Sequence, residues 1–212
     1  MKTNKLILLF LLFITAGGIK AQTQLMTEEE REYIEQNVIM KINDFLSYLP
    51  NIAAKSDKSA EEKELAYHYI DQALELFIGK GENYEYKDQA GNWRWHDAVT
   101  MQTTSRGRAN RPQPMKRYLR RLMALPYQHV EVDTCSAVRI NKRLHHLGNG
   151  KYVGSAYFIQ AFRATRDGKL VVNDVDAKQV TIYVEKRTID TPNGEKDYWL
   201  IQLGDIKIKT DW

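Results

Sequence analysis

The chain has 212 residues, of which 31 are Lys or Arg and 27 are Asp or Glu, and it contains one cysteine, Cys135. A chain of this length can bury a core without disulfides or a structural metal, and a lone cysteine excludes any disulfide within the chain. We expect the Cys135 thiol to be buried and inert, with a disulfide to a partner or a nucleophilic role as the alternatives.

The first residues are typical of a secretory signal peptide. A start that contains Lys2 and Lys5 precedes the apolar run LILLFLLFITA, and Ala21 offers a cleavage point. This run is shorter than the roughly 20 residues of a membrane-spanning helix. We therefore predict a signal peptide, residues 1–21, followed by a single exported domain, residues 22–212. An uncleaved anchor is the alternative.

The predicted cleavage changes the charge balance. It removes Lys2, Lys5 and Lys20 and no acid, which leaves 28 basic residues against 27 acidic ones. A nearly neutral protein lacks the overall positive field expected of a nucleic-acid-binding protein. We therefore do not expect nucleic acid as a partner, and only local clusters of charge need an explanation.

Two amphipathic helices are predicted at the start of the domain. Each begins with the Ser/Thr-x-x-Glu spacing of a capping box, at 27–30 and 59–62. Apolar residues then recur at steps of three and four. The first stripe stops at Pro50 and the second at Gly79. The stripes consist of Ile34, Val38, Ile42, Phe45, Leu46 and Leu49, and of Leu65, Ala66, Tyr69, Ile70, Ala73, Leu76 and Phe77.

Residues 84–104 alternate aromatic and polar side chains around a turn at 89–92, as a β-hairpin does. Trp93 and Trp95 share one face of this hairpin, and we expect that face to cover the helices. His96 and Asp97 are the minimum for a general base, although neighbouring residues of a strand point to opposite faces. A loop, 105–114, then leads into a short helix that ends before Pro126.

The rest of the chain is rich in β-branched and aromatic residues and predicts a series of antiparallel strands. Turn residues separate the strands at 148–150, 167–168 and 192–194. The strands are predicted at 127–140, 151–165, 178–188 and 198–210.

Two details of this region carry further predictions. In the last strand the apolar residues change parity between Leu203 and Ile206, which predicts a β-bulge near Gly204 and Asp205. The segment Asn173–Asp176 lacks the glycine and the glutamate of a calcium-binding loop and is predicted to be a polar connection.

This order of elements, two helices, a hairpin, a short helix and a meander of long strands, resembles the NTF2-like (SnoaL-like) superfamily. The resemblance covers nearly all of residues 27–212, with MKRYLRRLMAL as the third helix. It implies an α+β fold in which N-terminal helices pack on a curved antiparallel sheet to form a cone. The superfamily includes enzymes, transport factors and assembly domains, so the resemblance implies a pocket and no particular function. The segment VTMQTTSRGR…MKRYLRRLMALPYQHVEV also resembles small exported proteins of Bacteroidetes-type bacteria.

The candidate catalytic residues are His129, Glu131 and Asp133, which share one face of a predicted strand with Cys135. Such a row offers an acid and a base, or metal ligands. The alternative is a half-solvated strand whose valine face, at 130 and 132, packs on the core. The adjacent pair His145 and His146 is weak evidence for a metal, and no familiar catalytic or nucleotide-binding motif is present. We expect no metal and no cofactor.

The candidate binding residues form a basic cluster without an acid between them. Four lie on one arc of the predicted helix at 115–125, opposite its apolar face. Three precede the helix. The alternatives are a solvated helix face or contact with an acidic protein of the cell envelope, a polysaccharide or an anionic lipid surface. The cluster consists of Arg106, Arg108, Arg111, Lys116, Arg117, Arg120 and Arg121.

Two functions are consistent with these features. The first is an exported, non-enzymatic binding or assembly module of the periplasm or cell envelope, which is neither a lipoprotein nor, after signal cleavage, an integral membrane protein. The second is a small-molecule enzyme of isomerase or dehydratase type with a pocket between sheet and helices. The enzyme requires a cavity into which at least two titratable groups converge. The sequence favours the binding module and does not predict an oligomeric state.

Overall fold

The computed structural model describes residues 26–53, 59–88, 90–105, 108–134, 139–140 and 144–209. The fold begins with two capped helices. Helix α1 spans Glu28–Ala53 and helix α2 spans Ala60–Glu75. Both predicted capping boxes are confirmed. The Glu30 amide donates to the Thr27 hydroxyl over 3.1 Å, and the Glu62 amide donates to the Ser59 hydroxyl over 3.2 Å.

The first helix is longer than predicted. Pro50 lies inside α1, which continues to Ala53 instead of ending at the proline. Proline removes one helical hydrogen bond, but Ile52 and Ala53 are completely buried, and their burial favours the additional turn. The apolar stripe of α1 is buried along its whole length, as predicted. In α2 the stripe is confirmed except for Leu65, which is exposed.

In the part of the chain that the structure describes, the main sheet is mostly antiparallel and has eight strands. Its order is β6-β3-β12-β11-β10-β7, and β8 and β9 also pair with β10. Strand β12 pairs with β3 in parallel. The strands are β3 (Thr100–Met101), β6 (Gln113–Pro114), β7 (His129–Thr134), β8 (Arg139–Ile140), β9 (His145–Gly148), β10 (Lys151–Arg166), β11 (Lys169–Thr191) and β12 (Gly194–Ile208).

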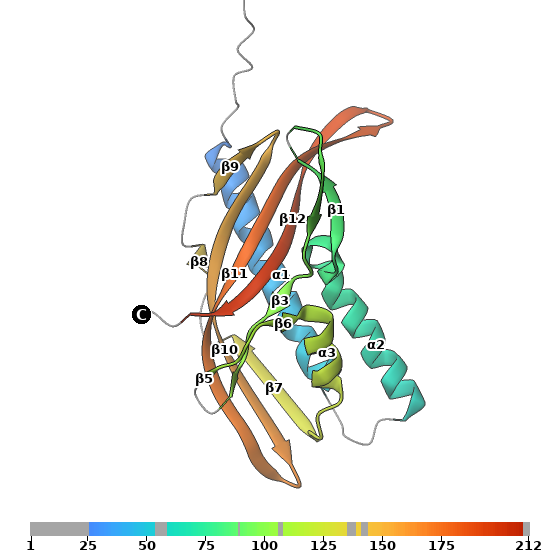
Figure 1. Ribbon diagram of the computed structural model, residues 1–212, viewed down its shortest axis with the longest axis vertical. Coiled ribbons are helices and arrows are strands. Elements are labelled where there is room, and N and C mark those ends of the chain that lie inside the picture. The colour runs from blue at the N-terminus through green and yellow to red at the C-terminus, as the bar shows by residue number, and fades with distance from the viewer. Residues whose placement is uncertain are drawn as a thin grey trace, which may run out of the picture.

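Helix α1 runs behind this sheet, and the long strands β10, β11 and β12 curve and twist along it (Figure 1). We call the side of the sheet that faces α1 its inner face. The core lies there, where Val180, Ile182 and Val184 of β11 are buried together with Phe45 and Leu49 of α1. The predicted α+β fold, with N-terminal helices on a curved antiparallel sheet, is confirmed for the described residues.

The predicted β-bulge in β12 is confirmed. Val180 pairs with Ile206 and Ile182 pairs with Leu203, so that one residue of β11 lies opposite Gly204 and Asp205. The extra residue restores the inner face after the change of parity, because Leu203 and Ile206 are both buried. The Asp205 carboxylate then accepts hydrogen bonds from the amide and the hydroxyl of Thr100, at 2.8 and 2.9 Å.

Strand β11 corrects one prediction. The segment Asn173–Asp176, predicted to be a polar connection, belongs to β11, where it pairs with residues 160–163 of β10. The polar side chains are accommodated because this part of the inner face borders a cavity rather than the packed core.

The predicted hairpin consists of β1 (Tyr84–Lys87) and β2 (Trp93–His96), which form a separate two-stranded sheet. The 3₁₀ turn η1 (Ile78–Gly81) connects it to α2, and a further small ladder pairs β4 (Thr104–Ser105) with β5 (Arg108–Ala109). The prediction that the tryptophan face covers the helices is wrong, because Trp93 and Trp95 are both exposed. The other face of the hairpin is the one that contacts the main sheet, through His96.

Helix α3 (Met115–Met123) has the two faces that the sequence predicts. Met115, Tyr118, Leu119 and Leu122 are buried, whereas Arg117, Arg120 and Arg121 are exposed. The helix contacts both α1 and α2 and is connected to the sheet through β6. It lies in front of the lower half of the molecule, beside β7 and β10 in the view of Figure 1.

Candidate functional site

A cavity of about 880 Å³ lies between α3, residues 103–104 and 110–113, and the inner face of β10 and β11. Helix α3 contributes Tyr118 and Leu122 to its wall, and β10 contributes Gln160 and Phe162. The wall is therefore part apolar and part polar, which is the usual composition of a small-molecule site.

Three charged residues of β11 line this cavity: Asp174, Asp176 and Lys178. Alternate residues of a strand share a face, so these three continue the inner row that Val180 and Ile182 occupy deeper in the core. The inner face of one strand thus changes from apolar to charged where it leaves the core and reaches the cavity.

Lys178 is the most deeply buried charged residue of this row, with 3% of its side chain exposed. Its ammonium nitrogen lies 3.4 Å from Asp176 Oδ2 and 3.4 Å from the carbonyl oxygen of Gln102. The Thr104 hydroxyl donates to the same carboxylate, 2.9 and 3.0 Å from its two oxygens. Thr104 therefore connects the segment opposite the sheet to the charged row.

Burial shifts the pKa values of the groups around this cluster. Loss of solvation lowers the pKa of Lys178, and the charge of Asp176 opposes that change. Burial also raises the pKa of the Tyr118 hydroxyl, and the negative charge of Asp176 adds to the rise. Tyr118 is therefore a neutral hydroxyl at physiological pH.

The basic arc of α3 divides into two columns with different surroundings. Lys116 and Arg120 are one helical turn apart and lie near Glu82. Lys116 forms a salt bridge with Glu82, and this contact, reinforced by the charge of Arg120, lowers the pKa of the Glu82 carboxyl. Half of the arc therefore has an acid beside it, which comes from the loop after η1.

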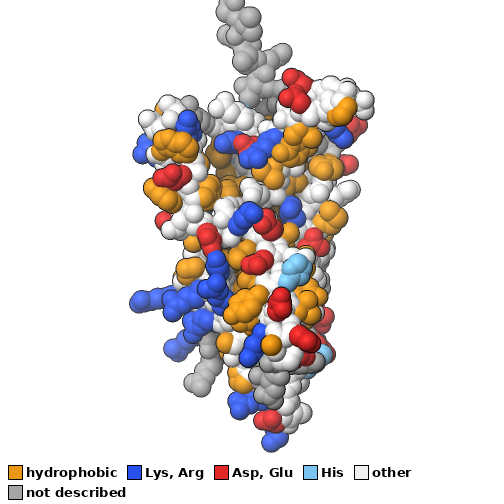
Figure 2. Space-filling view, turned by 90° about the vertical axis from the view of Figure 1, so that its right-hand side faces the viewer, with side chains coloured by type: hydrophobic (Ala, Val, Ile, Leu, Met, Phe, Trp, Pro, Cys, Tyr) orange, Lys and Arg blue, Asp and Glu red, His pale blue; other side chains and the backbone are white. Residues whose placement is uncertain are grey.

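The second column, Arg117 and Arg121, lines the cavity together with Arg111. Arg121 donates to the side-chain oxygen of Gln113 over 3.2 Å. Arg111 and Arg117 form no salt bridge within the part of the chain that the structure describes. In Figure 2, Lys and Arg side chains gather on one side of the molecule at the height of α3.

The candidate catalytic residues from the sequence lie elsewhere. His129, Glu131 and Asp133 point away from the core on β7, with 65, 53 and 61% of their side chains exposed. His129 Nε2 lies 3.1 Å from a Glu131 oxygen, and Arg163 donates to Asp133 over 3.1 Å. None of the three lines the cavity.

The remaining candidates from the sequence are not part of the cavity lining as described. Arg108 is exposed and does not line the cavity. Arg106, Cys135 and residues 1–21 lie outside the described residues.

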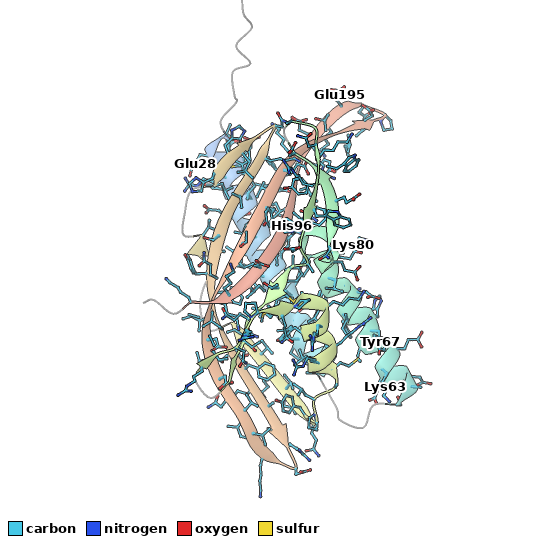
Figure 3. The ribbon with its side chains drawn as sticks, viewed as in Figure 1. Glu28, Lys63, Tyr67, Lys80, His96 and Glu195 are labelled. Carbon is cyan, nitrogen blue, oxygen red and sulfur yellow. The ribbon has the colours of Figure 1, made fainter. Side chains whose placement is uncertain are left out.

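His96 lies between the β1–β2 hairpin and the main sheet (Figure 3). Its Nδ1 is 2.7 Å from the Asp97 carbonyl oxygen, which can only accept, so this nitrogen carries the proton. Its Nε2 then accepts from the Tyr183 hydroxyl, 3.3 Å away. The Asp97 carboxylate does not orient the imidazole as in a catalytic dyad. A second hollow of about 670 Å³ borders these residues.

The sequence does contain a signal for the charged row. It becomes visible when the predicted strand 178–188 is extended towards its N-terminus to include residue 174. Asp174, Asp176 and Lys178 have the same parity as Val180 and Ile182. Read as one strand, the pattern places three charges on a face that is otherwise core. Lys178, the buried member of the row, also has a pKa shifted by burial, and such groups are frequent at functional sites.

The fold and the cavity define an α+β protein whose N-terminal helices pack on a mixed sheet, with a partly polar, partly apolar cavity between its third helix and that sheet. Comparisons with protein-family models, with curated proteins and with solved structures find no match. In the described residues no helix is long and apolar enough to cross a membrane, and no three His, Cys, Asp or Glu side chains are grouped to hold a metal ion.

Proposed function

We propose that the protein is an exported, non-enzymatic binding module of the periplasm or cell envelope, and that it holds a small anionic ligand in the cavity between α3 and the sheet. The observation that carries this proposal is the position of Arg111, Arg117 and Arg121 on the lining of that cavity. Guanidinium groups bind carboxylates and phosphates through paired hydrogen bonds.

The charges of the lining support an anion rather than a neutral ligand. Arg111, Arg117, Arg121 and Lys178 lie on it against Asp174 and Asp176. The positive excess comes from the three arginines, because Lys178 is already paired with Asp176. A cleft lined mainly by one sign of charge attracts ligands of the other sign.

The apolar part of the lining indicates the rest of the ligand. Leu122 and Leu125 from the α3 region and Phe162 and Val172 from the sheet contribute carbon surface to the same cavity. An acid with an apolar body satisfies both parts of the wall. Lys116 and Arg120 do not line the cavity, and Glu82 compensates the charge of Lys116 through a salt bridge. The positive charge without an acid beside it is therefore inside the cavity. This favours a small molecule over an acidic protein, a polysaccharide or a lipid surface.

The NTF2-like form and the export are parts of this proposal. The first is supported by the element order and by helices packed on a curved sheet with a cavity between them. The second is supported by the signal-peptide pattern of residues 1–21.

A titration with the anionic apolar dye anilinonaphthalene sulfonate tests the proposal. We expect saturable fluorescence enhancement in the wild-type protein. The double variant Arg117→Ser/Arg121→Ser should bind the dye at least about tenfold more weakly, because a hydrogen bond to a charged group contributes roughly 1.5 kcal/mol. The matched control is Lys116→Ser/Arg120→Ser, which removes the same charge from the column beside Glu82.

Equal affinities of the two double variants would reject the cavity as the anion site. If the control variant alone lost binding, the dye site would lie on the side of α3 that carries Lys116 and Arg120, and the cavity would again be rejected. Circular dichroism of each variant establishes that the fold is retained.

A second candidate function is an isomerase- or dehydratase-type enzyme, and the charged row favours it. Asp174 and Asp176 are carboxylates in a cavity that also contains the neutral Tyr118 hydroxyl, an arrangement suited to proton transfer. An enzyme would exchange carbon-bound protons of its ligand with D₂O, as observed by NMR, and Asp176→Asn would abolish the exchange. A binding module would show none.

A further inference from the structure

The amine of Lys178 is a nucleophile that the binding of an anion does not require. It lies on the inner face of β11 at the cavity, and its neighbours hold it loosely. Its two oxygen contacts, to Asp176 and to the Gln102 carbonyl, are both 3.4 Å long. Charge-assisted hydrogen bonds of ammonium groups are normally about 2.7–2.9 Å long. Among the described residues, the amine is therefore buried without the tight shell of acceptors that fixes a purely structural lysine.

We propose that Lys178 forms a reversible imine with the carbonyl group of an anionic ligand, and that this ligand is an α-oxo acid with an apolar side chain. The inference rests on the proposed function, because the arginines of the cavity are needed to hold the carboxylate. It adds a covalent step that binding alone does not contain.

The surroundings of Lys178 favour the neutral amine that such a reaction needs. Burial lowers the pKa of Lys178 against the opposing effect of Asp176, and this shift increases the fraction of unprotonated amine at a given pH. Asp176 lies beside the amine, and Thr104 donates a hydrogen bond to that carboxylate. Thr104 is therefore a positioning residue for Asp176.

The step balances without an oxidant or a reductant. The ammonium proton passes to the Asp176 carboxylate, and the free amine attacks the carbonyl carbon to form a C–N bond. One of the two protons left on the nitrogen moves to the carbonyl oxygen, which becomes the hydroxyl of a neutral carbinolamine. The hydroxyl then leaves as water with the proton that Asp176 took up, and the C–N bond becomes a double bond. Ammonium and carbonyl thus give a protonated imine and water, and hydrolysis reverses the reaction.

The lining contains a partner for each part of an α-oxo acid. The carboxylate is assigned to the guanidinium groups of Arg117 and Arg121, and the adjacent carbonyl to the amine of Lys178, because all three side chains line the same cavity. The apolar side chain is assigned to Leu122 and Phe162. A hydroxy acid of the same shape should bind through its carboxylate but cannot form the imine.

Phenylpyruvate and phenyllactate test the proposal as a matched pair, because they differ only in the carbonyl group. Each is first tested for displacement of anilinonaphthalene sulfonate from the wild-type protein. The protein is then incubated with each acid and sodium cyanoborohydride, which reduces an imine to a stable secondary amine. Peptide mapping by mass spectrometry locates the modified residue.

We expect both acids to displace the dye and only phenylpyruvate to modify the protein, at Lys178. Excess phenyllactate should suppress the modification. In Lys178→Arg, dye displacement should persist while the modification is lost, and Lys116→Arg should be modified like the wild type. If both acids displace the dye but phenylpyruvate leaves Lys178 unmodified, the imine is rejected while anion binding stands. If neither displaces the dye, the proposed function fails for this ligand class, and the imine proposal fails with it.

Discussion

The pairing of Lys178 with Asp176 is unusual because both charges lie on the inner face of a central strand, a position otherwise occupied by valine and isoleucine. Burying such a pair costs the solvation free energy of both charges. The electrostatic attraction between them offsets that cost only when their contact is close. At 3.4 Å the contact is not close. The pair is therefore better explained by what the cavity does than by stability.

Removing one partner of this pair should destabilise the protein. Lys178→Met leaves Asp176 partly buried beside Thr104 without its cation, so we expect the free energy of unfolding to fall by about 3 kcal/mol. The double variant Asp176→Asn/Lys178→Met removes both charges and should recover most of that loss. Urea denaturation measures all three proteins. A double variant no more stable than the single one would show that Lys178 contributes mainly through its packing.

Among the secondary-structure elements, the β1–β2 hairpin contacts the main sheet through His96 and contacts η1 through the Tyr84 ring, which lies against Gly79. Gly79 has φ of +60°, and a Cβ atom placed there would lie 2.2 Å from the Tyr84 ring. The ring of Tyr84 in turn stacks on His96, with their centroids 5.0 Å apart. The backbone of η1 thus sets the position of the aromatic side chains that connect the hairpin to the sheet.

We expect Gly79→Ala to destabilise the protein by at least about 2 kcal/mol, because it combines left-handed backbone strain with a steric overlap. The matched control is Gly91→Ala in the turn between β1 and β2. Gly91 has φ of +82°, but a Cβ atom placed there would meet no other atom within 4 Å, so only the backbone cost of about 1 kcal/mol should appear. Thermal unfolding distinguishes the two, and equal losses would contradict the steric explanation.

The elements that the sequence predicts correctly are those with local signals. The capping boxes of α1 and α2, the turns between the long strands and the bulge at Gly204 each follow from a few neighbouring residues. The two faces of α3 also follow from its own periodicity. These features need no knowledge of what packs against them.

The elements that the sequence misplaces depend on distant contacts. The first half of β11 resembles a connection in the sequence because Asp174 and Asp176 break the alternation of a half-buried strand. They are tolerated because they line a cavity, opposite α3 and residues 103–104 and 110–113, instead of the packed core. Pro50 stays inside α1 because the core buries the turn after it. The four basic residues of α3 differ in their surroundings because Glu82, which is distant in the sequence, lies beside Lys116 and Arg120.

At the scale of the whole molecule, a cluster of three charged residues connects the first helix to the last two strands. Lys186 of β11 lies 3.3 Å from Glu30 in the first turn of α1 and 3.3 Å from Asp197 of β12. The hydrogen bond from the Thr27 amide, followed by the contact with Lys186, lowers the pKa of the Glu30 carboxyl against the opposing effect of burial. Contacts with Thr188 and Lys186 lower the pKa of Asp197.

These shifts determine how stability depends on pH. A carboxyl whose pKa is lower in the folded than in the unfolded protein stabilises the fold above its unfolded pKa. That contribution is lost as the pH falls through the folded pKa. The ordinary pKa values of the two groups are 4.5 and 3.8. We therefore expect the free energy of unfolding to decline below about pH 4.5.

Lys186→Met should make this decline smaller, because without the cation the two carboxyls are closer to their unfolded pKa values. The variant should therefore lose more stability near neutral pH than in acid. Lys63→Met is the matched control, since it removes the same charge from the exposed side of α2 (Figure 3). Urea denaturation of the three proteins between neutral pH and about pH 3 gives the comparison. Parallel pH profiles for the wild type and Lys186→Met would show that the attachment of α1 to the β11–β12 hairpin depends on packing and on the Thr27 cap, and not on this cluster of charges.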